Sequence, residues 1–185
     1  MPESIWTLLD RSVDEAAPRL LGCRLIRVLD DEELELRITE IEAYDQNDPA
    51  SHSFRGPSAR NAVMFGPSGH LYVYLSYGVH YCCNVAAGPK GFGSGILIRA
   101  GEPLKGIKTM EKLRGLSGPN LSNGPGKVCQ ALAIDMRLSG HNLREGPLRL
   151  VEGFLKEGEE IMTSSRIGIS KAKELQRRYF IKKPV

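Results

Sequence analysis

Two glutamates stand where a strand-like pattern predicts apolar side chains. Leu34, Leu36 and Ile38 alternate with polar residues, as expected of a strand with one buried face. If this alternation continues, Glu40 and Glu42 point to the same face. A carboxylate at the edge of a core can act as a general base, because partial desolvation and a cationic neighbour set its protonation. A bulge that turns both carboxylates away, or an arginine that pairs with them, is the structural alternative.

Glu42 is the better candidate of the two because it ends the strand-like segment. Ala43 and Tyr44 follow it, and then comes a long loop over residues 45–70 that is rich in Asp, Asn, Ser, Pro and Gly. Long loops in compact domains are commonly functional. We therefore expect a pocket to open beside Glu42. The spacing of Glu40 and Glu42 is compatible with one base and one structural acid, and does not by itself make a glycosidase pair.

Tyrosines form a second group of candidate residues. Apolar residues alternate with tyrosines over residues 71–76, which predicts a strand with Tyr72 and Tyr74 on one face, and Tyr77 falls at the turn of the predicted hairpin. An aromatic side chain at a hairpin tip is typical of proteins that stack on nucleic acids or wedge into them. Packing in the core is the alternative. We expect it for Tyr72 and Tyr81, whereas for Tyr74 and Tyr77 both interpretations stay open.

The elements that must position these residues are short and of mixed type. In chain order, the patterns predict a helical lead-in over 5–21, hairpins over 24–44 and 71–87, a short strand over 95–99, helices over 105–114 and 126–133, and a strand over 148–151. No repeat or linker divides the 185 residues. We therefore expect residues 1–185 to form a single mixed α/β domain.

The charge is unevenly distributed along the chain. The formal net charge is +3, but residues 1–100 carry 9 basic and 13 acidic residues, whereas residues 101–185 carry 16 and 9. Nine of the acids lie between Asp30 and Asp48. Such asymmetry suggests a polyanionic partner, with an ordinary solvated surface as the alternative.

Composition also argues against several classes of protein. No window approaches the roughly 18 consecutive apolar residues of a membrane span, and the N-terminal residues lack a basic and apolar signal, so we expect a cytoplasmic protein. The four cysteines lack the paired spacing of a disulfide framework or a zinc ribbon. His80 and Cys82 are at most half of a metal site. We expect no metal and no cofactor, and small core roles for Cys23, Cys82, Cys83 and Cys129.

A series of short motifs runs through nearly the whole chain. They are R-I-T-E-I-E-A-Y at 37–44, A-S-H-S at 50–53, R-N-x-x-M-F at 60–65, Y-V-Y-x-x-Y-G at 72–78, Asn84, L-I-R-A at 97–100, N-G-P-G-K-x-C-Q-A-L at 123–132 and R-I-G-I at 166–169. Together they closely resemble the alkyladenine (3-methyladenine) DNA glycosylase family. The resemblance implies a single α+β domain around a curved, mostly antiparallel sheet, with a protruding β-hairpin that enters the DNA minor groove.

The resemblance also implies residue roles. Glu42 would activate the water that attacks the sugar C1′ of the damaged nucleotide, and Arg99 would help to hold that water and the DNA backbone. Tyr44 on one side, with His52 and Tyr74 on the other, would stack on the flipped purine. The loop that leads to His52 is shorter here than in the vertebrate-type pattern and carries Gln46 in place of a common glycine, which leaves the position of His52 to be determined.

Two further roles concern the DNA and the choice of base. Tyr77 would enter the minor groove and fill the gap left by the flipped nucleotide, as intercalating side chains do. Asn84 would lie on the pocket floor and exclude guanine by a clash with its exocyclic amine. Its alternation with His80 and Cys82 places it on the face opposite Val85.

The implied activity is that of a monomeric, monofunctional glycosylase of base-excision repair. It would hydrolyse the N-glycosidic bond of alkylated purines (3-methyladenine, 7-methylguanine) in double-stranded DNA and leave an abasic site. We expect no lyase activity, because no motif supplies a catalytic lysine or an N-terminal proline nucleophile. Hypoxanthine and ethenoadenine stay open as further substrates. The alternative is a non-catalytic binder of lesions or RNA, but Glu42 and Arg99 argue against it, since a binder needs no base beside its aromatic pocket.

Overall fold

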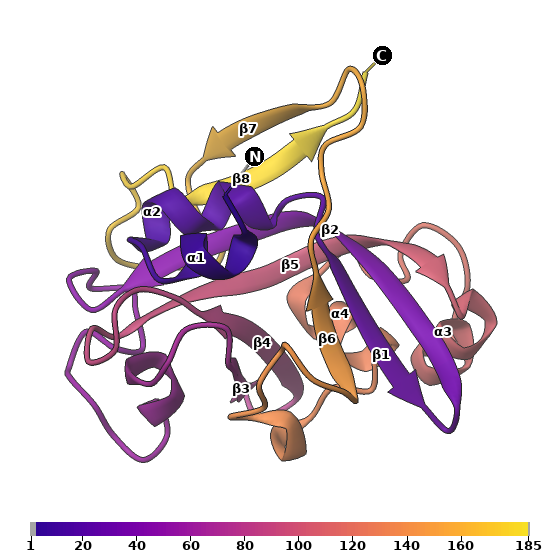
Figure 1. Cartoon of the computed structure of the whole chain (residues 1–185), viewed down its shortest axis with the longest axis horizontal. Coiled ribbons are helices and arrows are strands. Elements are labelled where there is room, and N and C mark those ends of the chain that lie inside the picture. Colours follow the sequence, from indigo (N-terminus) through magenta and orange to yellow (C-terminus); the bar gives the residue numbers. More distant parts are fainter. Residues whose placement is uncertain (1–2, 185) are drawn as a thin grey trace.

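One strongly curled antiparallel sheet organises residues 3–184, which are the residues that the computed structural model describes (Figure 1). The strand order is β3-β4-β5-β2-β1-β6, and β8 pairs with β2 and with β7. The strands are β1 (Arg24–Leu29), β2 (Glu32–Asp45), β3 (Leu71–Ser76), β4 (His80–Ala86), β5 (Ser94–Lys105), β6 (Leu148–Val151), β7 (Glu160–Ser164) and β8 (Arg178–Lys182). The predicted mixed α/β fold class around a curved, antiparallel sheet is confirmed, and the elements form a single compact domain.

The helices are short and lie around this sheet. They are α1 (Ile5–Leu9), α2 (Val13–Ala16), α3 (Ile107–Arg114) and α4 (Pro125–Ala131), with 3₁₀ turns η1 (Ala17–Leu20), η2 (Ala62–Phe65) and η3 (Met136–Leu138). The predicted lead-in over 5–21 is helical but broken into three pieces. Gly22 ends it with φ +89°, and a Cβ there would lie 2.6 Å from the Phe154 carbonyl oxygen. Only glycine therefore fits this turn.

Partway along the central strand β2, the side chains that pack in the core change from even-numbered to odd-numbered positions. Pairing with β5 is irregular over residues 38–41, where Thr39 on β2 and Arg99 on β5 each lack a partner in register. Bulges of this kind bend a strand and re-aim its side chains. Beyond these bulges, the residues of β2 that pack in the core are Ile41 and Ala43. The alternation therefore does not continue to Glu40 and Glu42, and the structural alternative, a bulge together with pairing to an arginine, is observed.

Beyond the bulges, one row of side chains crosses five neighbouring strands. Cross-strand pairing aligns Tyr72, Asn84, Leu97, Glu42 and Arg178. Partners in such a row point to the same face of a sheet, and the residues on the other face form the main hydrophobic core. The fold thus delivers phenol, amide and carboxylate groups to one side of the sheet.

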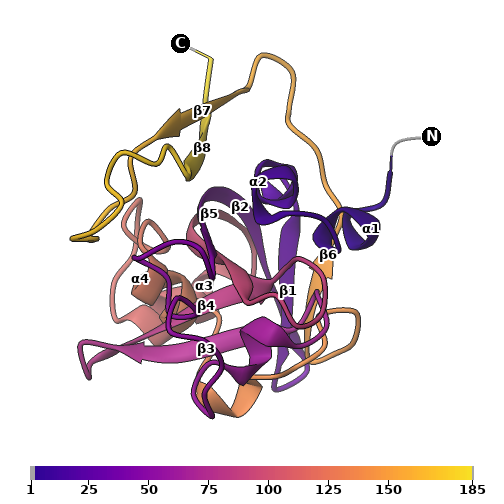
Figure 2. The same cartoon turned by 90° about the vertical axis from the view of Figure 1, so that its left-hand side faces the viewer.

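The hairpin of β3 and β4 protrudes from the body of the molecule (Figure 2). Its strands and its turn at Tyr77 lie where the alternation predicts them. By contrast, β5 runs on to Lys105, well past the predicted end at residue 99. The residues after Arg99 carry no alternating pattern, and it is their pairing with β2 that makes them a strand.

The C-terminal hairpin of β7 and β8 was not predicted, and it changes the interpretation of the charge. Arg178 pairs with Glu40 at 2.7 Å, and Arg177 pairs with Asp45 at 2.8 Å. The basic C-terminal segment therefore neutralises part of the chain's own acidic segment. The uneven charge that suggests a polyanionic partner is thus partly explained by ion pairs within the chain.

Candidate active site

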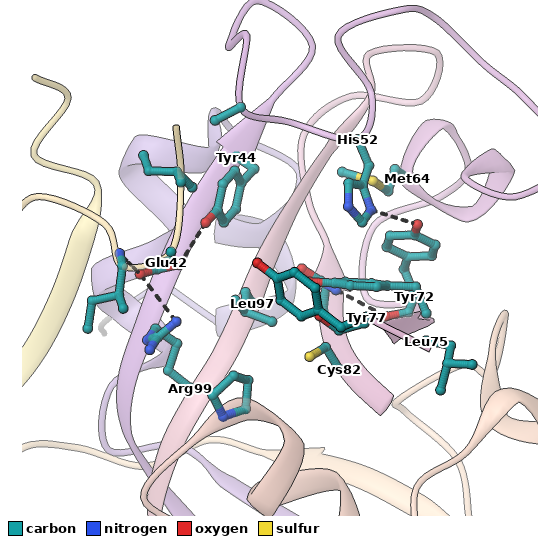
Figure 3. A pocket seen from close by; sticks show the side chains of 18 of the residues that line it. Glu42, Tyr44, His52, Met64, Tyr72, Leu75, Tyr77, Cys82, Leu97 and Arg99 are labelled. Carbon is teal, nitrogen blue, oxygen red and sulfur yellow. Dashed lines mark hydrogen bonds and ion pairs between the residues drawn. The ribbon is translucent and has the colours of Figure 1, made fainter. Parts of the chain in front are cut away.

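A cavity of about 400 Å³ opens on the face of the sheet that carries the row described above (Figure 3). We call one side of it the charged wall, formed by Glu42, Tyr44, Arg99 and Ile167. The opposite side is the aromatic wall, formed by His52, Tyr72 and Tyr74. All seven residues proposed for the site from the sequence line this one cavity: Glu42, Tyr44, His52, Tyr74, Tyr77, Asn84 and Arg99.

Glu42 is fully buried and is held by donors from three segments of the chain. The Tyr44 hydroxyl donates to Oε2 at 2.7 Å, and the backbone N–H of Ile167 donates to Oε1 at 2.7 Å. Arg99 Nη1 lies 3.4 Å from the same Oε1. These donors stabilise the ionised carboxylate. Because a carboxylate has about four acceptor positions, these three donors leave one position unfilled.

Arg99 reaches Glu42 because its backbone lies in the bulge of β5 and its side chain is anchored. Its Nε donates to Glu40 Oε1 at 2.9 Å, and Arg178 Nε donates to the same oxygen at 2.7 Å. Burial raises the pKa of Glu40, but the hydrogen bonds from Arg178 and Arg99 outweigh it and hold the pKa below its ordinary value. Glu40 is thus an ionised anchor for two arginines.

Tyr44 is supported from outside the cavity. The guanidinium of Arg166 lies 4.5 Å from the Tyr44 ring centroid. Arg166 also donates to the Ala43 carbonyl at 3.0 Å and forms a fully buried, two-pronged ion pair with Asp48. Burial and the neighbouring Glu42 carboxylate raise the pKa of Tyr44. The hydroxyl therefore stays protonated and remains a donor to Glu42.

Aromatic contacts build the opposite wall. The His52 and Tyr74 ring centroids lie 4.4 Å apart at 70°, an edge-to-face arrangement, and Tyr72 and Tyr74 lie 5.6 Å apart. His52 Nδ1 and the Tyr72 hydroxyl share a hydrogen bond of 3.0 Å. Partial burial and the positive charge of Arg60 lower the pKa of His52. Both His52 and Arg60 come from the long loop that the sequence marked as functional.

Asn84 and Tyr77 also line the pocket, one buried and the other exposed. Asn84 is buried beside Leu97, and its Nδ2 donates to the Tyr72 carbonyl at 3.3 Å. Tyr77 is 91% exposed and adopts φ +50°, an unusual backbone conformation for a bulky residue. Strained and exposed aromatic residues of this kind are found at sites of function more than at sites of folding.

The sequence did not predict several of the residues that line the cavity. Tyr72 is buried as expected, but it also lines the cavity, which its shared strand face with Tyr74 could have indicated. Ile167 contributes a backbone N–H, for which side-chain patterns give no signal. Cys82 is buried, as expected, and it also lines the cavity. All four cysteines are free and buried.

Within residues 3–184, no group of three or more His, Cys, Asp or Glu side chains is arranged to hold a metal ion. No helix in the same part of the chain is long and apolar enough to cross a membrane.

Comparison with known proteins now assigns the family. Residues 7–184 match the family model described as "Methylpurine-DNA glycosylase (MPG)", so the chain belongs to this family. The resemblance inferred from the motifs is thereby confirmed. Membership defines an enzyme of DNA repair that acts on DNA.

Curated relatives agree with this assignment, and each of the following carries the name "Putative 3-methyladenine DNA glycosylase". One from Carboxydothermus hydrogenoformans is 47% identical over 93% of this chain and 91% of its own length. One from Methanoculleus marisnigri is 45% identical over 94% and 92%. A third, from Nitrosospira multiformis, is 51% identical over 77% and 74%.

Proposed function

We propose that this protein excises alkylated purines of the 3-methyladenine and 7-methylguanine type from double-stranded DNA by hydrolysis of the N-glycosidic bond. One observation carries the proposal. A fully buried Glu42 with three donors faces an aromatic wall across a cavity large enough for a purine. The names of the relatives support the same substrate class.

Glu42 would act on the water molecule that takes its remaining acceptor position. The water oxygen bonds to the sugar C1′, the base departs with the electrons of the broken C–N bond, and the water proton passes to Glu42. The carboxylate also stabilises the positive charge that develops on the sugar. Arg99 fixes the carboxylate and helps to orient the water. The products are a free base and an abasic site.

The pocket suits a flipped base that already carries a positive charge. The flipped purine would stack between Tyr44 and the His52–Tyr74 pair, and ring faces attract cations. A neutral purine would need a proton donor to leave, but the lowered pKa of His52 keeps its ring neutral near neutral pH. We therefore propose that cationic methylpurines leave faster than hypoxanthine or ethenoadenine. Asn84, on the floor, would contact the base edge and exclude guanine.

A single chain is sufficient for this reaction, since all the proposed site residues line one cavity. We propose that the monomer is the active form and that it has no lyase activity. Tyr77 at the protruding turn would enter the minor groove and replace the flipped base in the stack.

The decisive experiment compares the wild type with Glu42→Gln in single-turnover assays on a duplex oligonucleotide that contains one 7-methylguanine. We expect the wild type to release the base and leave a heat-labile abasic site. Glu42→Gln should bind the duplex as tightly as the wild type does, but its rate of base release should fall by about 10²- to 10⁴-fold. Glu157→Gln, on an exposed carboxylate, is the matched control. No release by the wild type would instead support the non-catalytic binder, and a normal rate for Glu42→Gln would contradict the role of the base.

The role of Tyr77 has its own test. Because unstacking a base step takes a few kcal/mol, Tyr77→Ala should weaken binding to the lesion duplex by about tenfold or more. Binding of the free base should not change, and neither should the melting temperature, since the side chain is 91% exposed. Equal losses for duplex and free base would contradict the wedge.

A further inference from the structure

Two charged residues outside the proposed chemistry lie against the Glu42–Arg99 pair. Glu40 Oε1 accepts from both Arg99 Nε at 2.9 Å and Arg178 Nε at 2.7 Å. Arg178 stands directly opposite Glu42 in the pairing of β2 with β8. Its Nη1 also donates to Ser164 Oγ at 3.0 Å, which fixes its orientation. The resulting network contains two carboxylates and two guanidinium groups.

The network is shielded from solvent. The side chains of Glu42, Arg99, Glu40 and Arg178 are 0%, 14%, 20% and 21% exposed, respectively. Salt screens such groups far less than it screens surface charges. The formal charges of the four groups cancel, so a change in any one of them leaves a net charge beside Glu42.

We propose that Glu40 and Arg178 are positioning residues that balance the charge around Glu42 and thereby set the pH at which the glycosylase becomes active. The proposal rests on the proposed function of Glu42 as the base. Neither Glu40 nor Arg178 lines the cavity. Both act through Arg99, whose contact with Glu40 at 2.9 Å is shorter than its contact with Glu42 at 3.4 Å.

The sign of each effect follows from electrostatics. Without the negative charge of Glu40, Arg99 and Arg178 act on Glu42 uncompensated, which stabilises its ionised form. Activity should then persist to lower pH. Without the positive charge of Arg178, the negative charge of Glu40 is less compensated, and activity should begin at a higher pH. The two substitutions therefore have opposite effects on the acidic limb of the activity profile.

The other groups around Glu42 stay the same in every variant. They come from the elements packed around the carboxylate, namely Tyr44 on β2, Tyr74 on β3, Cys82 on β4, Arg99 on β5, and Arg166 and the backbone N–H of Ile167 before β8, with His52 and Arg60 across the cavity. Differences between variants thus report the charges of Glu40 and Arg178 and the hydrogen bonds that these two residues make. A variant that keeps the charge separates the two contributions.

The test measures single-turnover rates against pH with the same 7-methylguanine duplex, at saturating enzyme so that DNA affinity does not contribute. We expect Glu40→Gln to move the acidic limb to lower pH and Arg178→Gln to move it to higher pH, each by about half a pH unit or more. The double variant should return close to the wild type. Titration of the substrate itself is common to all variants and cancels.

Arg178→Lys is the matched control, because it keeps the charge but loses the Nε donor. The acidic limb of its activity profile should stay near that of the wild type. Shifts of Glu40→Gln and Arg178→Gln in the same direction, or no shift in either, would overturn the proposal. If Glu40→Gln does not fold, the comparison of Arg178→Gln with Arg178→Lys tests the proposal. Equal shifts of the acidic limb in these two variants would overturn it. Absence of base release by the wild type would contradict the proposed function instead, and is therefore a separate outcome.

Discussion

The two walls that face each other across the pocket are held by different forces. On the charged wall, Glu42 receives donors from β2, β5 and the segment before β8, and ion pairs hold those donors in turn. On the aromatic wall, ring contacts and one neutral hydrogen bond join His52, Tyr72 and Tyr74. Hydrogen bonds to charged groups are roughly twice as strong as neutral ones. We therefore expect the charged wall to be rigid and sensitive to single changes, and the aromatic wall to be more tolerant.

The largest effect should come from breaking the support behind the charged wall. Arg166→Met removes the two-pronged ion pair of the buried Asp48 and leaves this carboxylate only the backbone N–H of Ala50 at 2.9 Å and the more distant Arg177 at 3.9 Å. Loss of one partner from a buried pair typically lowers the free energy of unfolding by about 3–5 kcal/mol. Urea unfolding measures this loss, and Lys173→Met, on an exposed residue, is the control. A loss no greater than that of the control would mean that the buried pair does not hold this wall.

A matched pair of tyrosine substitutions compares the walls directly. Tyr44→Phe removes the hydroxyl that donates to Glu42 at 2.7 Å and leaves the ring in place. A hydrogen bond to a charged group contributes about 1.5–3 kcal/mol, so the single-turnover rate should fall by about 10- to 100-fold. The melting temperature should change far less than for Arg166→Met. An unchanged rate would show that the hydroxyl does not help to hold Glu42.

The same substitution on the aromatic wall should have a smaller effect. Tyr72→Phe removes the hydrogen bond to His52 at 3.0 Å between neutral groups. Such a bond contributes about 0.5–1.5 kcal/mol, so the rate should fall by roughly 2- to 10-fold. The ratio of the two rate losses is the quantity of interest. If Tyr72→Phe lowers the rate as much as Tyr44→Phe, the proposed difference between the walls is wrong.

The same contrast explains which parts of the site could be predicted from the sequence. The aromatic wall depends on alternation within β3 and β4, a local pattern that predicted the hairpin, its turn at Tyr77 and the shared face of Tyr72 and Tyr74. Glu42 was selected from alternation too, but the bulges of β2 and β5 place it on the opposite face from the one predicted. Bulges depend on the pairing of two strands, so one strand's sequence does not reveal them.

The supports of the charged wall depend on long-range contacts and could not be predicted in this way. The sequence marks Arg178 and Asp48 only as members of a basic and an acidic segment. It singles out Glu40 as a structural acid and Arg166 as part of a motif, but it identifies the ion-pair partner of neither. Opposite charges distant in sequence have many possible pairings, and only the fold selects among them. The motif around residue 166 helped to indicate the family, but it did not show that the backbone of Ile167 would donate to Glu42.

The smallest expected effect is a pH dependence of the stability that Glu40 contributes to the charged wall. Hydrogen bonds from Arg178 and Arg99 outweigh burial and lower the pKa of Glu40 in the folded protein relative to the unfolded chain. A carboxyl group of this kind stabilises the fold above its unfolded pKa of about 4.3, and the contribution is lost as the pH falls through the lower, folded value. The difference in unfolding free energy between the wild type and Glu40→Gln should therefore be largest near pH 7 and shrink as the pH falls below about 5. Denaturant unfolding at a series of pH values measures it, with Glu157→Gln, exposed to solvent, as the control. A difference that grows on acidification would mean that Glu40 is ionised more readily in the unfolded chain, and the charged wall would then not depend on its ion pairs.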